Sequence, residues 1–363
     1  MRIIISGGKT GGHLVPGIAL YEKAKARGHE VAYFLGPQDD RFAITSRIAR
    51  EDRYIVPIGS ISRKISLKTP LWIARILGAF FVTIKKVRQI QPDVVIITGG
   101  YISNPVALSA LLLRIPLYIL EQNTVAGITN RFFAPFARQI FTSFPKTEKI
   151  PPHKALFTGN PTIFSLPLPR HQARQFFTLP EENLCLGVIG GSQGAKKIND
   201  AIWSLLPFLQ ENTLFLLWSV GKNTYTAMEQ DGRLEKIQKD YPNVRVFPFI
   251  ERMDAFWGAC DGVIARSGAT TVAEVISASC PALFIPIYKS PDDHQKKNAL
   301  ALVKEGCADI LEEPQLTDLL PKVKDFLASL AQKKISLQQL RTHWQHHPEE
   351  QILQIIENQR ERR

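Results

Sequence analysis

The alternation of short apolar runs with polar or glycine-rich loops constrains the fold of this chain most strongly. In the C-terminal half, the runs Gly262–Ala265 and Ala282–Pro286 each lead into a polar loop and then into a segment with helix-like spacing of apolar residues. Such runs, alternating with helices, are typical of buried strands in a parallel sheet. The pattern therefore predicts an α/β fold, in which ligands bind at the loops that follow the strands.

The loop at residues 266–271 has the sequence Arg-Ser-Gly-Ala-Thr-Thr, and its small residues let a ligand approach the backbone where a helix begins. Glu274 follows one turn into that helix. Two roles fit this carboxylate: it compensates the helix dipole, or it accepts hydrogen bonds from the two hydroxyls of a ribose. Gln295 and Asn298 stand near the next helix start, and their uncharged amides suit sugar hydroxyls.

The N-terminus shows the same order of strand, loop and helix. Arg2–Ser6 has the composition of a buried strand, residues 7–12 form a glycine-rich loop, and His13 opens a helix with Pro16 near its first turn. A Walker A loop would need glycine in place of Ile3, and the glycine spacing of a dinucleotide fold is also missing. The remaining interpretation is a loop whose glycines let a pyrophosphate or a sugar lie against the backbone. His13 then either caps the helix or takes a proton from an attacking hydroxyl, since imidazole titrates near neutrality.

The pattern repeats in the second half of the chain. The predicted strand Leu184–Ile189 is followed by Gly-Gly-Ser-Gln-Gly-Ala at residues 190–195, where Ser192 can donate a hydrogen bond to a phosphate oxygen. A stretch punctuated by prolines, residues 159–180, separates the two halves and is typical of a hinge. We therefore predict two Rossmann-like domains with parallel sheets that face a cleft, followed by a C-terminal helix. Their expected limits are residues 1–160, 161–345 and 346–363.

Polar residues also follow two predicted strands of the N-terminal half. Val94–Thr98 is followed by Gly-Gly-Tyr at 99–101, and Leu117–Leu120 by Glu-Gln-Asn at 121–123. Because open α/β sheets bind ligands at the carboxyl ends of their strands, both loops are candidate binding loops. The acid and amides at 121–123 also fit a second role, in which they only tie neighbouring loops together.

Six segments, in this order along the chain, resemble the motifs of the MurG family of glycosyltransferases. They are GGKTGGH..P from residue 7, GGY.S.P from 99, EQN..AG.TNR from 121, GNP from 159, GGSQGA from 190, and a long segment from PFI at 248 through RSGA.T..E to DDHQ..NA at 292–299. The resemblance implies a GT-B fold whose last helix returns to the first domain. It also implies inverting transfer of N-acetylglucosamine from UDP-N-acetylglucosamine to the C4 hydroxyl of the muramyl sugar in lipid I, undecaprenyl-pyrophosphoryl-MurNAc-pentapeptide, which forms lipid II of peptidoglycan.

The resemblance assigns roles to residues by their positions in these motifs. His13 would be the general base. The residues expected at the donor are Thr10, Gly11, Gly12, Asn123, Ser192, Ile250, Ala269, Thr270, Thr271, Val272, Glu274 and Gln295. The residues expected at the acceptor pyrophosphate are Gly99, Gly100 and Tyr101. The chain departs from the family at an inserted Lys9 and at Ile163, which stands where the family has an arginine.

No cofactor and no tightly bound metal are expected. Asp292 and Asp293 are the obvious acidic pair, and their place before a helix is explained more simply as a feature of the helix start. The inverting reaction needs no protein nucleophile, because one in-line displacement converts the α-linked donor into a β-linked product.

Charge and one apolar segment suggest contact with a membrane. Residues 1–160 hold 22 basic and 9 acidic side chains, whereas the rest of the chain is almost neutral. A broad apolar surface at residues 71–84 is flanked by lysines and arginines, but Arg75 interrupts it and it is too short to span a bilayer. This segment is either a core helix or a helix that lies on an anionic membrane surface. We expect the second.

The compartment follows from the cysteines and the N-terminus. Cys185, Cys260, Cys280 and Cys307 are widely spaced, which favours buried free thiols in a reducing compartment over disulfides or a metal site. The apolar run at the N-terminus is too short for a signal peptide. We expect a cytoplasmic protein that is peripheral on the inner face of the cell membrane.

Alternatives from other classes remain at this stage. A UDP-N-acetylglucosamine 2-epimerase would share the fold and the nucleotide, but it would have no use for the apolar segment, and another UDP-sugar-dependent GT-B transferase would differ only in its acceptor. A nucleic-acid-binding protein would interleave aromatic and basic residues on an exposed surface, whereas the aromatic residues here fall mainly in apolar runs. We expect no nucleic-acid partner.

Overall fold

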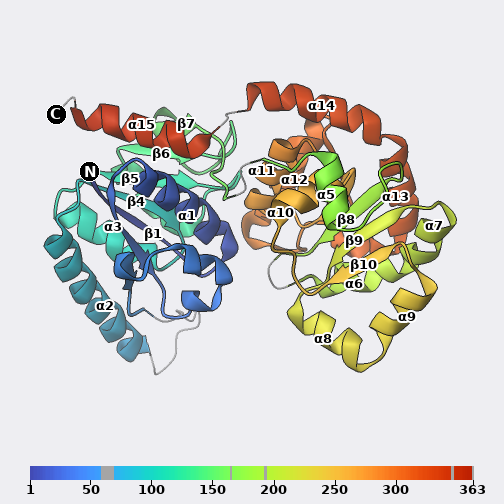
Figure 1. Ribbon diagram of the computed structural model, residues 1–363. Helices are drawn as coiled ribbons and strands as arrows, with labels where there is room; N and C mark the ends of the chain where they lie inside the picture. Colours follow the sequence, from blue (N-terminus) through green and yellow to red (C-terminus); the bar gives the residue numbers. More distant parts are fainter. Residues whose placement is uncertain (59–68, 164–165, 192–193, 345–346, 362–363) are drawn as a thin grey trace. The chain divides into compact units, whose positions relative to one another are not determined.

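The computed structural model describes every residue except 59–68, 164–165, 192–193, 345–346 and 362–363 (Figure 1). The chain divides into two compact units. The first comprises Met1–Ile163 and Gln345–Arg363, and the second comprises Phe164–Trp344. Each unit is built around one parallel sheet, so the predicted α/β class with two Rossmann-like sheets is confirmed.

The sheet of the first unit has seven strands in the order β3-β2-β1-β4-β5-β6-β7. The strand order changes direction between β1 and β4, which are neighbours in the sheet, and ligands bind α/β sheets outside the carboxyl ends of strands at such a point. The strands are β1 (Arg2–Gly7), β2 (Glu30–Leu35), β3 (Arg53–Ile55), β4 (Val94–Gly99), β5 (Leu117–Glu121), β6 (Gln139–Thr142) and β7 (Ala155–Phe157).

Helices cover both faces of this sheet. On one face, α1 (Gly11–Ala26) and α15 (Pro348–Glu361) share an apolar core with β1 and β2, so the last helix of the chain packs within the first unit. On the other face lie α2 (Thr69–Ile90), α3 (Ser103–Leu112) and α4 (Ile128–Phe133). Short 3-10 segments complete the unit: η1 (Asp39–Arg41), η2 (Ala43–Arg47), η3 (Arg50–Asp52), η4 (Ala134–Phe136) and η5 (Pro152–Lys154).

Helix α1 begins earlier than the sequence predicts. Gly11 and Gly12 are already helical, and Thr10 is the extended residue before them. Pro16 is therefore the sixth residue of α1 and lies inside the helix, so its predicted place near the first turn is wrong. Because proline has no N–H, the carbonyl of Gly12 loses its helical donor.

The sheet of the second unit has six strands in the order β10-β9-β8-β11-β12-β13. The strands predicted at 184–189, 262–265 and 282–286 are all present, as β8, β11 and β12. The strands are β8 (Cys185–Ile189), β9 (Phe215–Ser219), β10 (Val244–Phe247), β11 (Gly262–Ala265), β12 (Ala282–Phe284) and β13 (Ala308–Ile310).

Helix α5 precedes β8, and the other helices of the second unit fall in the connections between these strands and after β13. Those from residue 170 to 259 are α5 (Arg170–Phe176), α6 (Lys196–Ile202), η6 (Trp203–Leu205), α7 (Leu206–Glu211), α8 (Lys222–Gln230), α9 (Arg233–Asp240) and α10 (Met253–Ala259). The remainder are α11 (Ala269–Ala278), η7 (Pro291–Asp293), α12 (His294–Lys304), η8 (Glu313–Asp318), α13 (Leu319–Ala328) and α14 (Leu330–His343).

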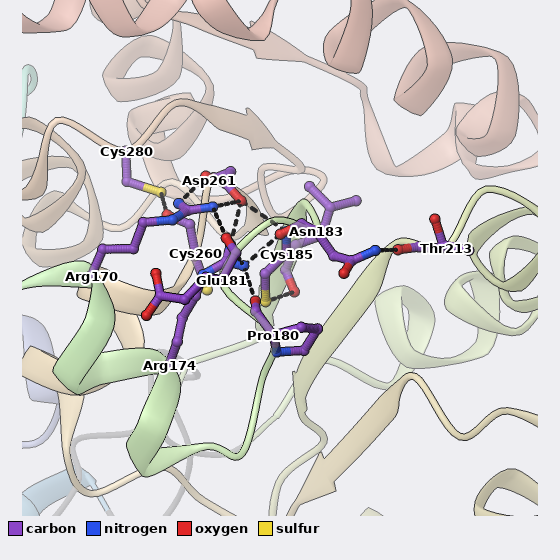
Figure 2. A network of polar contacts seen from close by, with 11 residues as sticks. Arg170, Arg174, Pro180, Glu181, Asn183, Cys185, Thr213, Cys260, Asp261 and Cys280 are labelled. Atoms are coloured by element: carbon purple, nitrogen blue, oxygen red, sulfur yellow. Dashed lines mark hydrogen bonds and ion pairs between the residues drawn. The ribbon is translucent and has the colours of Figure 1, made fainter.

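A buried ionic network holds α5 against the amino ends of two strands of this sheet. Figure 2 shows Arg170 and Arg174 converging on Asp261, which immediately precedes β11. Arg174 donates to Asp261 at 2.8 Å, and the same carboxylate accepts the backbone N–H of Cys185 at 2.9 Å. The network lies at the edge of the sheet opposite the candidate binding loops, so we assign it a role in stabilising the fold.

Two further expectations concern cysteines and membrane spans. All four cysteines are buried free thiols, as the sequence predicts. In the described part of the chain, no helix is long and apolar enough to cross a membrane.

Candidate functional site

His13 is held in one orientation by a residue at the carboxyl end of β4 and a residue just after β5. Its Nδ1 atom lies 2.8 Å from the carbonyl oxygen of Thr98 and 3.3 Å from Oε1 of Gln122. The amide of Gln122 is oriented in turn, because its Nε2 donates to the carbonyl of Leu120 at 3.0 Å. Both neighbours of Nδ1 are acceptors, so Nδ1 carries a hydrogen, and Nε2 is the ring nitrogen that can exchange a proton with a substrate.

Two glycines of the predicted acceptor loop lie against the imidazole ring. A Cβ atom at Gly99 would lie 2.9 Å from Cε1 of His13, and one at Gly100 would lie 3.2 Å from the carbonyl oxygen of Gly8. Both glycines have a positive φ, 106° and 80°, which other residues rarely adopt. The structure therefore brings the candidate base, the N-terminal glycine loop and the loop at residues 99–101 together at one edge of the first sheet.

Asp39, which the sequence analysis did not single out, fixes the N-terminal glycine loop. Its buried carboxylate accepts the backbone N–H of Lys9 at 2.8 Å through Oδ1 and that of Gly36 at 2.7 Å through Oδ2. Thr10 and Gly12 are exposed and Gly11 is half-buried, so this part of the loop is open to a ligand. The acidic pair that follows β2 is the sequence feature that points to Asp39.

Glu121 ties the loops after β5 together. Its carboxylate is buried and accepts the backbone N–H groups of Asn123 at 2.9 Å and Gly127 at 3.0 Å, and also Nδ2 of Asn130 at 2.8 Å. Glu121 therefore has the second role that the sequence left open, which is to tie neighbouring loops together. Asn123 is half-buried beside it, and its Nδ2 lies 3.4 Å from the same carboxylate.

In the second unit, polar side chains join the two loops that the sequence analysis singled out. Ser267 donates to the carbonyl of Gln295 at 2.8 Å, and Asn298 donates to the carbonyl of Ser267 at 3.2 Å. The side-chain oxygen of Gln295 accepts the N–H of Ile287 at 3.0 Å. Asn298 is fully buried, so its role is structural, whereas Gln295 is half-buried at the carboxyl edge of the sheet.

The remaining predicted donor residues of this unit lie in α11, with two exceptions, Ile250 and Ser192. Thr270 and Thr271 are half-buried, whereas the side chains of Ala269 and Val272 are buried and leave only backbone groups for a ligand. Ile250 follows β10 and is buried next to the exposed Phe249. Ser192 lies outside the described residues.

Glu274 is the most unusual ionisable group of this unit. It is the sixth residue of α11, beyond the first turn, so the helix-start role considered from the sequence is wrong. Burial raises the pKa of its carboxyl to about 8, and the nearby indole of Trp257 offsets only part of this effect. Within the described part of the chain, the buried hydroxyl of Thr270, one helical turn before Glu274, has no hydrogen-bond partner, and the indole N–H of Trp257 lies near Glu274 without the geometry of a full hydrogen bond. Such groups are costly unless a ligand satisfies them.

A second carboxylate, Glu313, was not predicted and links three loops at the same edge. It accepts the N–H of Tyr288 at 3.0 Å, Arg266 at 3.1 Å and Lys197 at 2.7 Å. Burial alone would raise the pKa of Glu313, but Lys197, Tyr288 and Arg266 outweigh burial and lower it. Glu313 therefore stays ionised and holds two cations close to residues 266–271.

Two further predictions concern Ile163 and metal ions. Ile163 packs against the apolar core between α1, α15 and the first sheet, so no cation stands at this position. Among the residues that the structure describes, no group of three or more His, Cys, Asp or Glu side chains could hold a metal ion.

Comparison with known proteins gives consistent matches over most of the chain. Residues 3–142 match the glycosyltransferase family 28 N-terminal domain, and residues 185–354 match the glycosyltransferase family 28 C-terminal domain. The UDP-N-acetylglucosamine–N-acetylmuramyl-(pentapeptide) pyrophosphoryl-undecaprenol N-acetylglucosamine transferase of Amoebophilus asiaticus is 30% identical, over 99% of this chain and 100% of that protein.

Solved structures give the same architecture. The crystal structure of Acinetobacter baumannii MurG matches with a TM-score of 0.76 and 28% identity, over 98% of this chain and 99% of that chain. A UDP-GlcNAc 2-epimerase from Neisseria meningitidis matches with a TM-score of 0.67 but 13% identity, over 99% and 100% of the two chains, so that likeness concerns the fold alone.

Proposed function

Because the chain belongs to the family of UDP-N-acetylglucosamine–N-acetylmuramyl-(pentapeptide) pyrophosphoryl-undecaprenol N-acetylglucosamine transferases, we propose that it transfers N-acetylglucosamine from UDP-N-acetylglucosamine to lipid I. The product is lipid II, the disaccharide precursor of peptidoglycan. The two parallel-sheet units have the GT-B architecture of such transferases, as the sequence predicts.

His13 is the general base in this proposal, and the fixed tautomer of its ring is the observation that carries it. The Nδ1–H group donates to the carbonyl of Thr98, so the basic nitrogen is Nε2. The C4 hydroxyl oxygen of the muramyl sugar attacks the anomeric carbon of N-acetylglucosamine, while the bond from that carbon to the β-phosphate oxygen of UDP breaks. The electron pair leaves with UDP, and the hydroxyl proton passes to Nε2. A single displacement of this kind inverts the anomeric centre.

The second unit holds the donor in this proposal. Glu274 accepts hydrogen bonds from the ribose hydroxyls, which stabilise the ionised form of a carboxyl whose pKa burial raises. Backbone N–H groups at the start of α11 and the hydroxyl of Ser192 balance the negative charge that develops on the leaving diphosphate. Gln295 and Asn123 bind the sugar hydroxyls, and Ile250 lies against the uracil.

The outer face of helices α2, α3 and α4 is the proposed contact with the anionic membrane surface that carries lipid I. On α2, the residues that face the core include the small side chains Ala79, Thr83 and Val87, while larger apolar side chains face outward. Among the side chains of these helices and η4 whose burial the structure describes, the exposed apolar residues are Leu77, Phe81, Val82, Leu108, Leu112, Ile128, Phe132 and Phe136. Lys85, Arg88 and Arg114 are exposed on or beside the same helices. Apolar side chains with flanking cations are the pattern expected of a peripheral membrane face.

The experiment that tests the proposed function measures transfer of labelled sugar from UDP-N-acetylglucosamine to a short-chain lipid I analogue. Incorporation that depends on the analogue supports the proposal. If the protein binds the donor but labels no acceptor, the acceptor assignment is wrong.

A further inference from the structure

Lys9 lies in the N-terminal glycine loop, between Gly8 and Thr10. It has a left-handed backbone conformation, with φ of 74°, and its side chain is exposed. Its ammonium nitrogen lies over the ring of Tyr101, 5.3 Å from the ring centre. Lys9 therefore places a positive charge beside the loop at residues 99–101.

The backbone of Lys9 is fixed, whereas its charge is not neutralised by an ion pair. Asp39 holds the backbone N–H of Lys9 at 2.8 Å, and Asp39 is itself buried and also bonded to Gly36. Among the side chains that the structure describes, no carboxylate forms an ion pair with the Lys9 ammonium group. Burial and the charge of Asp39 raise the pKa of Tyr101, and Arg41 is near enough to offset part of this effect, so a second cation lies in the same region.

We propose that Lys9 binds the diphosphate of the lipid-linked acceptor and so contributes to selection of that substrate. The inference rests on the proposed transfer to lipid I and deepens it. Three features support it: an ammonium group on a flexible stem is a suitable point charge for phosphate oxygens, the neighbouring glycines allow close approach to the backbone, and the anchored loop holds the charge near His13. The donor also carries a diphosphate, so the test must separate the two substrates.

The test compares Lys9→Met, which removes the charge, with Lys9→Arg, which keeps it. Lys239→Met, an exposed lysine on α9 of the second unit, is the matched control. In transfer assays with a short-chain lipid I analogue, Lys9→Met should raise the KM for the acceptor by roughly 10-fold or more, the size expected for a lost charged contact. The donor KM should change less than about twofold, and Lys9→Arg should stay near wild type. A rise in the donor KM alone, or no change in either KM, overturns the proposal.

A binding arm distinguishes failure of this inference from failure of the proposed function. Methylenediphosphonate, a stable diphosphate, is titrated calorimetrically into wild type, Lys9→Met, Lys9→Gln and the Lys239→Met control, after thermal melting has shown that each is folded. Weaker binding by both neutral Lys9 variants, with the control unchanged, supports the role of Lys9 even if wild type transfers no sugar. Equal binding by all folded proteins overturns it.

Discussion

The Nδ1 atom of His13 lies 2.8 Å from the carbonyl oxygen of Thr98, a residue 85 positions further along the chain. A backbone carbonyl cannot donate, so this contact sets the ring tautomer without depending on the side chain of Thr98. Gln122 adds a second acceptor at 3.3 Å. The order of strands in the first sheet thus places Thr98 beside His13, and this contact leaves Nε2 as the basic nitrogen of the ring.

Replacing His13 by glutamine should lower kcat by about 100-fold or more, the usual contribution of a general base. Binding of UDP should stay within about twofold of wild type, because the reacting proton does not take part in nucleotide binding. Single-turnover transfer assays and calorimetric titration with UDP measure the two quantities. Turnover near the wild-type rate would exclude His13 as the base.

Glu274 should make donor binding depend on pH. Its pKa in the unliganded protein is about 8, so it is mostly protonated at pH 7. Ribose hydroxyls donate to the ionised carboxylate, which lowers its pKa on binding, so affinity for UDP-N-acetylglucosamine should rise with pH up to about 8 and then level off. Calorimetric titrations from pH 6.5 to 8.5 should show this slope for wild type and a weaker, flat affinity for Glu274→Gln. The same slope in the variant would remove Glu274 from the ribose site.

A rise in pH, which should strengthen donor binding through Glu274, should lower the stability of the unliganded protein through the same carboxyl group. The pKa of Glu274 is raised from 4.5 to about 8 by burial, so its contribution to stability is fully present below pH 4.5 and is lost as pH rises through 8. A glutamine at this position does not ionise, so the variant does not lose this stability as the pH rises. At pH 8.5 the unliganded Glu274→Gln variant should therefore melt a few degrees above wild type, whereas at pH 5 the two should differ little.

The exposed apolar residues of the first unit should drive vesicle binding. Phe81→Ser combined with Phe132→Ser should weaken partition into anionic vesicles by about 10-fold or more, since each phenylalanine loses the gain from burying its ring. Ile335→Ser on α14, an exposed apolar residue of the second unit, is the control and should have no effect. Co-sedimentation with anionic vesicles measures the partition. An equal loss in the control would mean that the contact is not specific to these helices.

Arg174 and Arg170 share Asp261 but should differ in their contribution to stability. The side chain of Arg174 is 1% exposed and also donates to backbone carbonyls, including that of Glu181 at 3.0 Å, whereas the side chain of Arg170 is 39% exposed. Arg174→Met should destabilise the second unit by about 3 kcal/mol or more, because it leaves buried acceptors unpaired. Arg170→Met should cost about 1 kcal/mol or less. Urea unfolding measures both, and equal losses would contradict the account.

The sequence predicted the parts of the site that lie within single segments. Glycine loops and apolar runs revealed the strands around His13 and residues 266–271, because these patterns are local. The partners that fix the site are distant in sequence: Asp39 anchors Lys9, and Glu313 joins Arg266 to Lys197. These contacts depend on the order in which strands pair, which no local pattern specifies.

The orientation of α2 was also beyond the sequence. Apolar residues of α2 itself fall on most sides of the helix, so their spacing alone fits both a core helix and a surface helix. Only packing shows that Ala79 and Val87 face the core while Phe81 faces outward. Glu274 is a similar case, because its burial and its raised pKa follow from the packing of α11 against α10.

The most direct test of the central claim is analysis of the products formed by wild type from UDP-N-acetylglucosamine and a short-chain lipid I analogue. NMR should show release of UDP only when the analogue is present, together with a disaccharide in which N-acetylglucosamine is β-linked to C4 of the muramyl sugar. Formation of UDP-N-acetylmannosamine without the analogue would instead identify a 2-epimerase. A different linkage or acceptor position would contradict the proposed reaction.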